Sequence, residues 1–248
     1  MSLVPSLTEL ICELGLAAHL VGRTGFCVHP RDVVRRIPKV GGTKDVNSER
    51  IRELLPSHLI VNIDENEKPT VDKLARFVPN IIVTHPLAPR DNLVLYRLLG
   101  GIFGCTERAE ELCIEFERAY DDVIAACRAR PRQKVLYLIW HKPWMTVSRD
   151  TYISRTLALI GWDTLPAVAN ARYPEIELDA ALLAEADHIL LSSEPYRFRE
   201  RDVAALEKLL PPAASRKVRL IDGEMTSWYG SRAIQGLAYL KDFRLAAA

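Results

Sequence analysis

The chain has 248 residues, which is enough for two domains of about 100–150 residues each. Its 33 lysines and arginines are balanced by 32 aspartates and glutamates, and this balance argues against a nucleic acid or an anionic membrane as the main partner. Hydrophobic residues make up 48% of the chain, yet no apolar run approaches the ~20 residues of a membrane span, so the composition indicates an ordinary globular protein.

Short apolar runs alternate with helical patterns along the chain. The runs with strand character are 59–63, 81–84, 135–139, 189–192 and 218–221. The helical patterns are 8–14, 49–55, 70–77, 92–99, 151–160, 179–184, 202–210 and 232–241. Continuous runs of β-branched residues and leucine are typical of parallel strands that are buried on both faces. The alternation therefore predicts an α/β protein with two Rossmann-like lobes built on parallel sheets.

One longer helical pattern separates the two halves. Apolar residues in segment 106–128 recur at gaps of three, one and four, and acidic residues follow Thr106 in the first turns. A helix of this length runs for ~35 Å, which is about the width of a small domain. We therefore expect an N-terminal α/β lobe over 1–105, an interlobe helix over 106–130 and a C-terminal α/β lobe over 131–248.

Large aromatic residues follow two of the predicted strands. They are Trp140, Trp144, Trp228 and Tyr229. Open α/β sheets bind ligands beyond the carboxyl ends of their strands, and exposed aromatic residues on loops tend to mark binding surfaces. These residues are predicted to line a ligand cleft, and the alternative is that they form an apolar core between the lobes.

Other loop residues complete the candidate ligand site. Arg23, His141 and Arg232 could supply its polar groups, and the arginines could pair with a carboxylate or phosphate of the ligand. The further candidates for ligand contact are Phe26, His29 and Tyr196. His29 and His141 are loop histidines that could also reach a bound metal, although a solvated or hydrogen-bonded role is the simpler interpretation. The metal ligands, if any, stay open.

The sequence contains none of the common catalytic motifs. It has no phosphate-binding glycine loop, no nucleophile elbow and no zinc-ligand spacing, so no nucleophile is nominated. The five cysteines include no C-x-x-C pair, and Cys12, Cys113 and Cys127 are expected to be small buried apolar residues. Asp150 is expected to cap the helix that follows it.

Four segments, taken in order, resemble the substrate-binding proteins of ABC importers for vitamin B12, haem and iron–siderophores, which are the class III binding proteins or helical-backbone metal receptors. These segments are 2–9, 21–30, 40–60 and the long helix 106–128. The resemblance implies a binding protein that is not an enzyme and has no cofactor of its own. Its ligand would be a corrinoid such as cobalamin, haem or an iron–siderophore, held between the lobes.

The resemblance also implies a partner and a compartment. An ABC transporter permease would bind an acidic residue on each lobe, and the candidates are Glu65 or Glu67 and Glu194 or Glu200. The lobe segments 49–62 and 179–192 echo each other, which places both acidic loops after equivalent strands. The family implies a periplasmic monomer, but the chain as given has no signal peptide and could be cytoplasmic. The rival interpretations are a chelatase-like enzyme acting on a tetrapyrrole and a cytosolic binding protein without a transporter.

Overall fold

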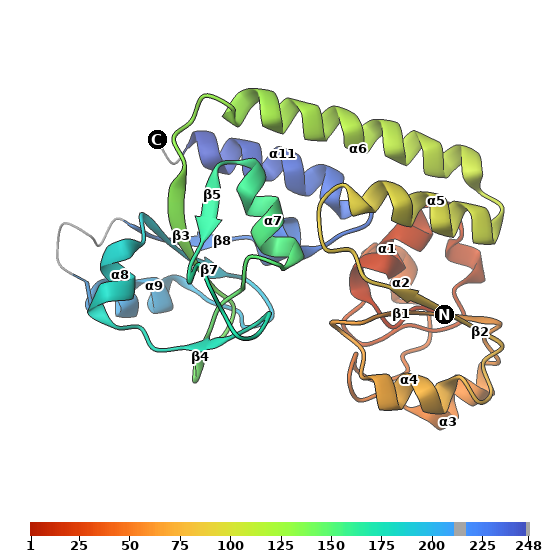
Figure 1. Ribbon diagram of the computed structural model, residues 1–248. Helices are drawn as coiled ribbons and strands as arrows, with labels where there is room; N and C mark the ends of the chain where they lie inside the picture. The colour runs from red at the N-terminus through yellow and green to blue at the C-terminus, as the bar shows by residue number, and fades with distance from the viewer. Residues whose placement is uncertain (211–216, 247–248) are drawn as a thin grey trace. The chain divides into compact units, whose positions relative to one another are not determined.

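The structure is a computed structural model that describes residues 1–210 and 217–246 (Figure 1). The described residues form two compact units. Unit 1 consists of residues 1–86, 90–115 and 229–232, and unit 2 takes the described parts of 87–89, 116–228 and 233–248. No helix among residues 1–210 and 217–246 has both the length and the apolar content that crossing a membrane requires.

Unit 1 is built on parallel strand pairing. Its elements are α1 (Pro5–Glu13), η1 (Ala17–His19), α2 (Arg31–Val34), α3 (Ser48–Glu53), β1 (His58–Asn62), α4 (Lys68–Leu74), β2 (Asn80–Thr84) and α5 (Asp91–Phe103). Strands β1 and β2 pair in parallel from His58 opposite Asn80 to Asn62 opposite Thr84. Single parallel bridges continue the array from Ile60 to Ser2, from Ser2 to Arg23 and from Arg23 to Lys39.

Apolar side chains at alternate positions of this array pack against helices α3 and α4 and form the core of unit 1. The cluster joins Leu3, Leu59 and Val61 to Ile51 of α3 and Leu74 of α4. Figure 1 shows these two helices together on one side of β1 and β2. Residues of period two along a strand face the same side of a sheet, which is why Leu59 and Val61 share this core.

Unit 2 contains the larger sheet. Its elements are β3 (Gln133–Leu138), β4 (Trp144–Met145), α7 (Tyr152–Leu159), β5 (Trp162–Thr164), β6 (Glu175–Ile176), α8 (Ala180–Glu185), β7 (His188–Ser192), α9 (Glu200–Glu207), β8 (Val218–Ile221), α10 (Gly223–Ser227) and most of α11 (Arg232–Leu245). Four parallel strands lie in the order β5-β3-β7-β8, and β4 pairs with β6 in a separate antiparallel pair. One face of the main sheet, through Leu136, Leu138, Ile189 and Leu191, packs against Leu183 of α8 and Leu206 of α9.

The parallel α/β architecture predicted from the sequence is confirmed. Each of the five predicted strands is observed within two residues of its expected limits. The long helix α6 spans Thr106–Cys127, and the division between the units falls within it, after Glu115. Unit 1 also includes residues 229–232. The expected domain limits, drawn at the two ends of the helix, assigned these residues to the C-terminal lobe.

Two local expectations are wrong. Thr151, not Asp150, caps α7, because its side chain accepts a hydrogen bond from the Ser154 amide while the Asp150 carboxylate accepts one from Ser148. Cys12 is half-buried rather than buried, whereas Cys113 and Cys127 are buried as expected. All five cysteines are free thiols.

Candidate functional site

Five aromatic rings gather at the carboxyl ends of β3 and β7 in unit 2. The hairpin after β3 contributes Trp140, His141 and Trp144, and the loop after β7 contributes Tyr196 and Phe198. His141 lies 4.3 Å from Trp144 between ring centroids, Trp140 lies 5.7 Å from Tyr196, and Tyr196 lies 4.7 Å from Phe198. We call these five residues the aromatic cluster.

Parallel pairing of β3 with β7 brings the two loops of the aromatic cluster together. The Tyr196 amide donates a hydrogen bond of 3.2 Å to the Ile139 carbonyl, which fixes the second loop against the end of β3. Phe198 is buried and stacks on Trp144 with an interplanar angle of 5°. Trp140 remains 39% exposed, so the cluster has a buried base and an aromatic face that solvent can reach.

The structure brings together Trp140, His141, Trp144 and Tyr196, four of the residues expected to contact the ligand, and it adds Phe198, which the sequence analysis did not name. Tyr196 and Phe198 stand two residues apart in the loop, and this spacing was the available signal. Their rings contact each other and Phe198 fills the space beneath Trp144. Phe198 therefore supports the cluster from its buried side.

Trp228 is not an exposed loop residue. Its side chain is only 8% exposed, and its indole Nε1 donates a 2.7 Å hydrogen bond to Oε1 of Glu194. Ser227 Oγ donates to the same oxygen at 2.8 Å. Burial raises the pKa of the Glu194 carboxyl, and these two donors only partly oppose that shift. Trp228 is therefore buried rather than exposed on a loop, and its expected place in the lining of a ligand cleft stays a prediction.

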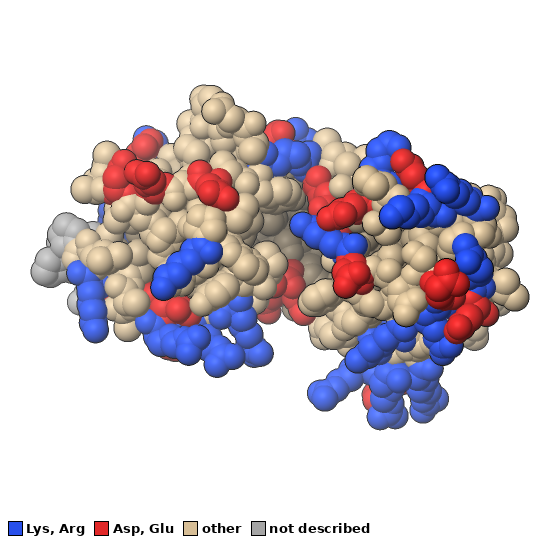
Figure 2. All heavy atoms as spheres, turned by 90° about the horizontal axis from the view of Figure 1, so that it is seen from below, with Lys and Arg blue, Asp and Glu red and all other residues tan. Residues whose placement is uncertain are grey.

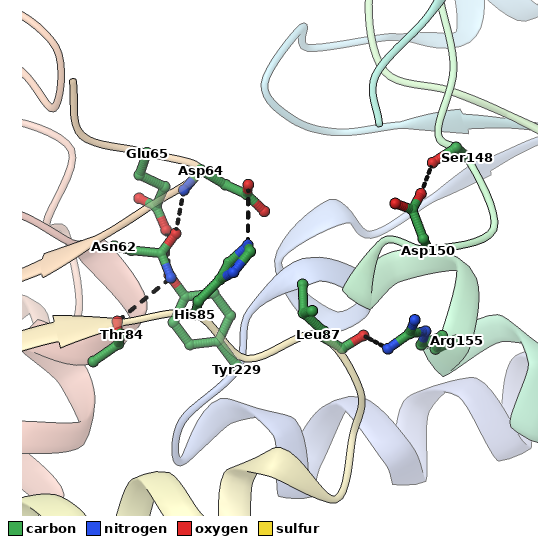
Figure 3. Close-up of polar contacts among 10 residues, drawn as sticks. All are labelled: Asn62, Asp64, Glu65, Thr84, His85, Leu87, Ser148, Asp150, Arg155 and Tyr229. Atoms are coloured by element: carbon green, nitrogen blue, oxygen red, sulfur yellow. Dashed lines mark hydrogen bonds and ion pairs between the residues drawn. The ribbon is translucent and has the colours of Figure 1, made fainter. Parts of the chain in front are cut away.

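Tyr229 is also buried, and it belongs to unit 1. Its hydroxyl donates a 2.6 Å hydrogen bond to Oε1 of Glu65, in the loop after β1 (Figure 3). Burial raises the pKa of the Tyr229 hydroxyl far above its usual value, with the Glu65 charge adding to the shift. The next residue, Gly230, has a φ of +82° and approaches the Ser6 carbonyl so closely that a Cβ would stand 3.2 Å from its oxygen. This segment is therefore an internal part of unit 1 rather than an exposed loop.

The two arginines expected to meet the ligand make hydrogen bonds within unit 1. Arg232 is buried and forms a bidentate ion pair with Glu9, with nitrogen–oxygen distances of 2.8 and 2.6 Å. Arg23 is buried and donates to the carbonyls of Val34 and Thr24. A guanidinium that is desolvated and already hydrogen-bonded has little left to offer a ligand, so the expected ligand role of both residues is not supported by their surroundings.

Phe26 and His29 lie in the loop that follows the bridge residue Arg23. Phe26 is 63% exposed, and its ring lies beside Gly42, since a Cβ on that glycine would stand 3.4 Å from the ring. His29 is half-buried. No group of three or more His, Cys, Asp or Glu side chains suited to a metal ion occurs in the described part of the chain. The ligand roles of Phe26 and His29 stay predictions.

A polar network occupies the carboxyl ends of β1 and β2 in unit 1 (Figure 3). Asn62 Oδ1 accepts from the Asp64 amide at 2.8 Å, and Asn62 Nδ2 donates to Thr84 Oγ1 at 3.4 Å. Asp64 Oδ1 lies 3.3 Å from His85 Nε2. These contacts give the loop after β1 a defined conformation, and they engage Asp64 within unit 1.

The four acidic residues considered for docking divide into two kinds. Glu65 and Glu194 are partly buried and accept hydrogen bonds from Tyr229 and Trp228. Their carboxylates are therefore engaged inside the protein rather than directed at a partner. Glu67 and Glu200 are exposed at the starts of α4 and α9. On the face drawn in Figure 2, acidic side chains lie among Lys and Arg on each unit, so neither unit shows a surface of one sign there.

The comparisons with known proteins agree on one family and one fold. The sequence profile of the family described as periplasmic binding protein matches residues 1–218. The vitamin B12-binding protein of Photorhabdus laumondii subsp. laumondii is 21% identical over 233 residues, which cover 94% of this chain and 82% of that protein. The vitamin B12-binding protein of Vibrio vulnificus is 22% identical over 197 residues, which cover 77% of this chain and 70% of that protein.

Solved structures extend the similarity to the fold of the whole chain. The periplasmic vitamin B12 binding protein of Vibrio cholerae has a TM-score of 0.85 at 17% identity, with 99% of this chain and 96% of that chain covered. A periplasmic haem-binding protein from a Roseiflexus species has a TM-score of 0.84 at 21% identity, with 99% and 97% covered. At these identities the structural similarity shows a shared fold.

Proposed function

The chain belongs to the periplasmic binding protein family, and on that premise we propose that it captures a metal-containing ligand for an ABC importer, either a corrinoid or haem, whose ring is planar, or an iron–siderophore. The observation that carries the proposal is the aromatic cluster at the carboxyl ends of β3 and β7, with Trp140 exposed at its surface. The ligand is bound and released without chemical change. The protein acts in the periplasm, as its family does, and has a permease as its partner.

The physical basis of capture is contact between aromatic faces and a flat ligand. An exposed indole offers a large apolar area and a ring that stacks, and such a ring has few rotatable bonds to immobilise on binding. Phe198 and Trp144 hold the cluster from below in a parallel stack, so the surface is formed before the ligand arrives. Vitamin B12 and haem, the ligands named for the relatives, belong to this class of flat molecules and support the choice.

Titration of the purified protein with cobalamin, haemin and a ferric siderophore, followed by quenching of tryptophan fluorescence, tests this proposal. Trp140→Ala should weaken binding of the preferred ligand by about 1–3 kcal/mol, the usual scale for an aromatic anchor. The matched control is Leu209→Ala, which removes another exposed apolar side chain of unit 2 outside the cluster. Unchanged affinity in Trp140→Ala, or no binding of any of the three ligands, would refute the proposal.

A further inference from the structure

Lys142 stands at the turn of the hairpin that carries three rings of the aromatic cluster. The Met145 amide donates to the Trp140 carbonyl at 3.2 Å and closes the hairpin around residues 141–144. Lys142 has a φ of +68°, a left-handed backbone conformation that residues with a side chain seldom adopt. Glycine would adopt it freely, so the turn alone gives no reason for a lysine at this position.

The ammonium group of Lys142 is exposed and has no internal partner. Within residues 1–210 and 217–246, no hydrogen bond or ion pair engages it, in contrast to Lys134 of the same unit, which binds Glu185 at 2.9 Å. Its neighbour in sequence, His141, contacts both Trp144 and Tyr196. Lys142 is therefore bonded in sequence to a member of the aromatic cluster, at the turn of the same hairpin.

A second free cation lies on the neighbouring loop. Arg197 is exposed between Tyr196 and Phe198, and over the described residues its guanidinium takes part in no ion pair. Two acids lie three residues from Arg197 in sequence. Glu194 is held inward by Trp228 and Ser227, and the exposed Glu200 forms no ion pair with Arg197 within the described residues. Both loops of the cluster thus carry a cation that the protein leaves unneutralised.

We infer that the aromatic cluster selects a planar ligand with acidic groups at its edge, and that Lys142 and Arg197 bind those carboxylate or phosphate oxygens. The inference rests on the proposed function and names the ligand class for the same site. It reassigns to these two residues the role that the sequence suggested for Arg23 and Arg232, which are bound to Val34, Thr24 and Glu9 instead. Ammonium and guanidinium groups are the side chains that suit carboxylates and phosphates.

Two matched pairs of probes test the charge of the ligand. Haemin carries two carboxylates and its dimethyl ester carries none. Cobalamin carries a phosphodiester within a nucleotide that cobinamide lacks altogether, so in this second pair the effect of Lys142→Ala and Arg197→Ala, rather than the wild-type preference alone, reports the contact with phosphate. In one of these pairs at least, the wild-type protein should bind the acidic member more tightly than the neutral analogue. Lys142→Ala and Arg197→Ala should each weaken binding of that acidic member by about tenfold, the scale of one charge-assisted hydrogen bond, and should leave the analogue unaffected.

Controls separate charge from folding. Lys142→Arg keeps the charge and should restore most of the affinity, whereas Lys208→Ala removes an exposed lysine of unit 2 away from the cluster and should change nothing. The preference should also weaken with added salt, because salt screens exposed charges over ~8–10 Å.

The outcomes distinguish this inference from the proposed function. Equal wild-type affinity for both members of each pair, or an equal loss for acid and analogue in the alanine variants, overturns the inference and leaves ligand capture intact. Failure of the wild-type protein to bind any of the four probes overturns the inference, and the proposed function falls with it when the ferric siderophore also fails to bind.

Discussion

Trp228 and Glu194 form a hydrogen bond of 2.7 Å between the indole Nε1 and the carboxylate Oε1, and both side chains lie inside unit 2. The next residue, Tyr229, repeats the arrangement in unit 1 with Glu65. Two adjacent aromatic residues thus each donate to an acidic residue in the loop that follows a parallel strand, β7 in one unit and β1 in the other. These acids stabilise the fold from within.

Removal of the Trp228 donor should destabilise the protein. Trp228→Phe keeps an aromatic ring but leaves Glu194 with one donor fewer, and we expect a loss of about 1.5–3 kcal/mol in the free energy of unfolding, the range for hydrogen bonds to charged groups. Urea unfolding of Trp228→Phe, Glu194→Gln and the double variant measures the coupling between them. Additive effects of the two substitutions would show that this hydrogen bond contributes no stability.

Glu194 should also give the protein a specific pH dependence. Its folded pKa is raised above the usual 4.5, so between these two values the folded state holds a proton that the unfolded state has lost. The contribution of Glu194 to stability is therefore fully present below pH 4.5 and is lost as the pH rises through the folded pKa.

Glu194→Gln, which cannot titrate, should lose less stability than wild type over that interval of pH, as measured by urea unfolding at a series of pH values. The control Glu117→Gln, at an exposed position on α6, should follow the wild-type curve. Parallel curves for wild type and Glu194→Gln would contradict the assignment.

The strands and the aromatic cluster could be predicted from the sequence because the signals are local. Segment 189–192 is a continuous apolar run and forms β7, and Trp140 and Tyr196 follow neighbouring parallel strands, whose carboxyl ends lie at one edge of the sheet. Once β3 and β7 are recognised as parallel, the meeting of these two loops follows.

The burial of Trp228, Tyr229 and Arg232 could not be predicted in this way. Their partners are 34, 164 and 223 residues distant in the sequence, namely Glu194, Glu65 and Glu9. Nothing in the local pattern distinguishes an arginine that is free for a ligand from one that a distant carboxylate already holds. For the same reason the sequence did not show that Lys142 lacks an ion-pair partner, because this depends on its neighbours in space.

The segment that unit 1 takes from the far end of the chain should contribute measurably to stability. Tyr96 donates from its hydroxyl to the Gly230 carbonyl at 2.8 Å, and both groups are buried. Tyr96→Phe leaves that carbonyl without this donor, and we expect a loss of about 1–2 kcal/mol in the free energy of unfolding. Tyr196→Phe serves as the control, since no hydrogen bond engages the Tyr196 hydroxyl within the described residues. Equal stability of Tyr96→Phe and wild type would show that the Gly230 contact is dispensable.

Docking to a permease should depend on the exposed acids and not on the buried ones. We expect that charge reversal at Glu67 and Glu200 together abolishes stimulation of the importer's ATPase and leaves ligand affinity unchanged, because complementary charges set register and association rate. Glu117→Lys, an exposed reversal on α6, is the matched control. Full stimulation by the double reversal would remove these two residues from the docking surface.

Native mass spectrometry of freshly purified protein, combined with its visible absorption spectrum, tests the capture of a metal-containing ligand most directly. The account predicts a fraction of the protein with an added mass that matches a corrinoid, haem or an iron–siderophore, together with the absorption bands of that ligand. It also predicts that Trp140→Ala, purified in parallel, carries less of it. Wild-type protein that emerges without ligand, and that gains no mass and no visible band when any of the three is added, would contradict the account.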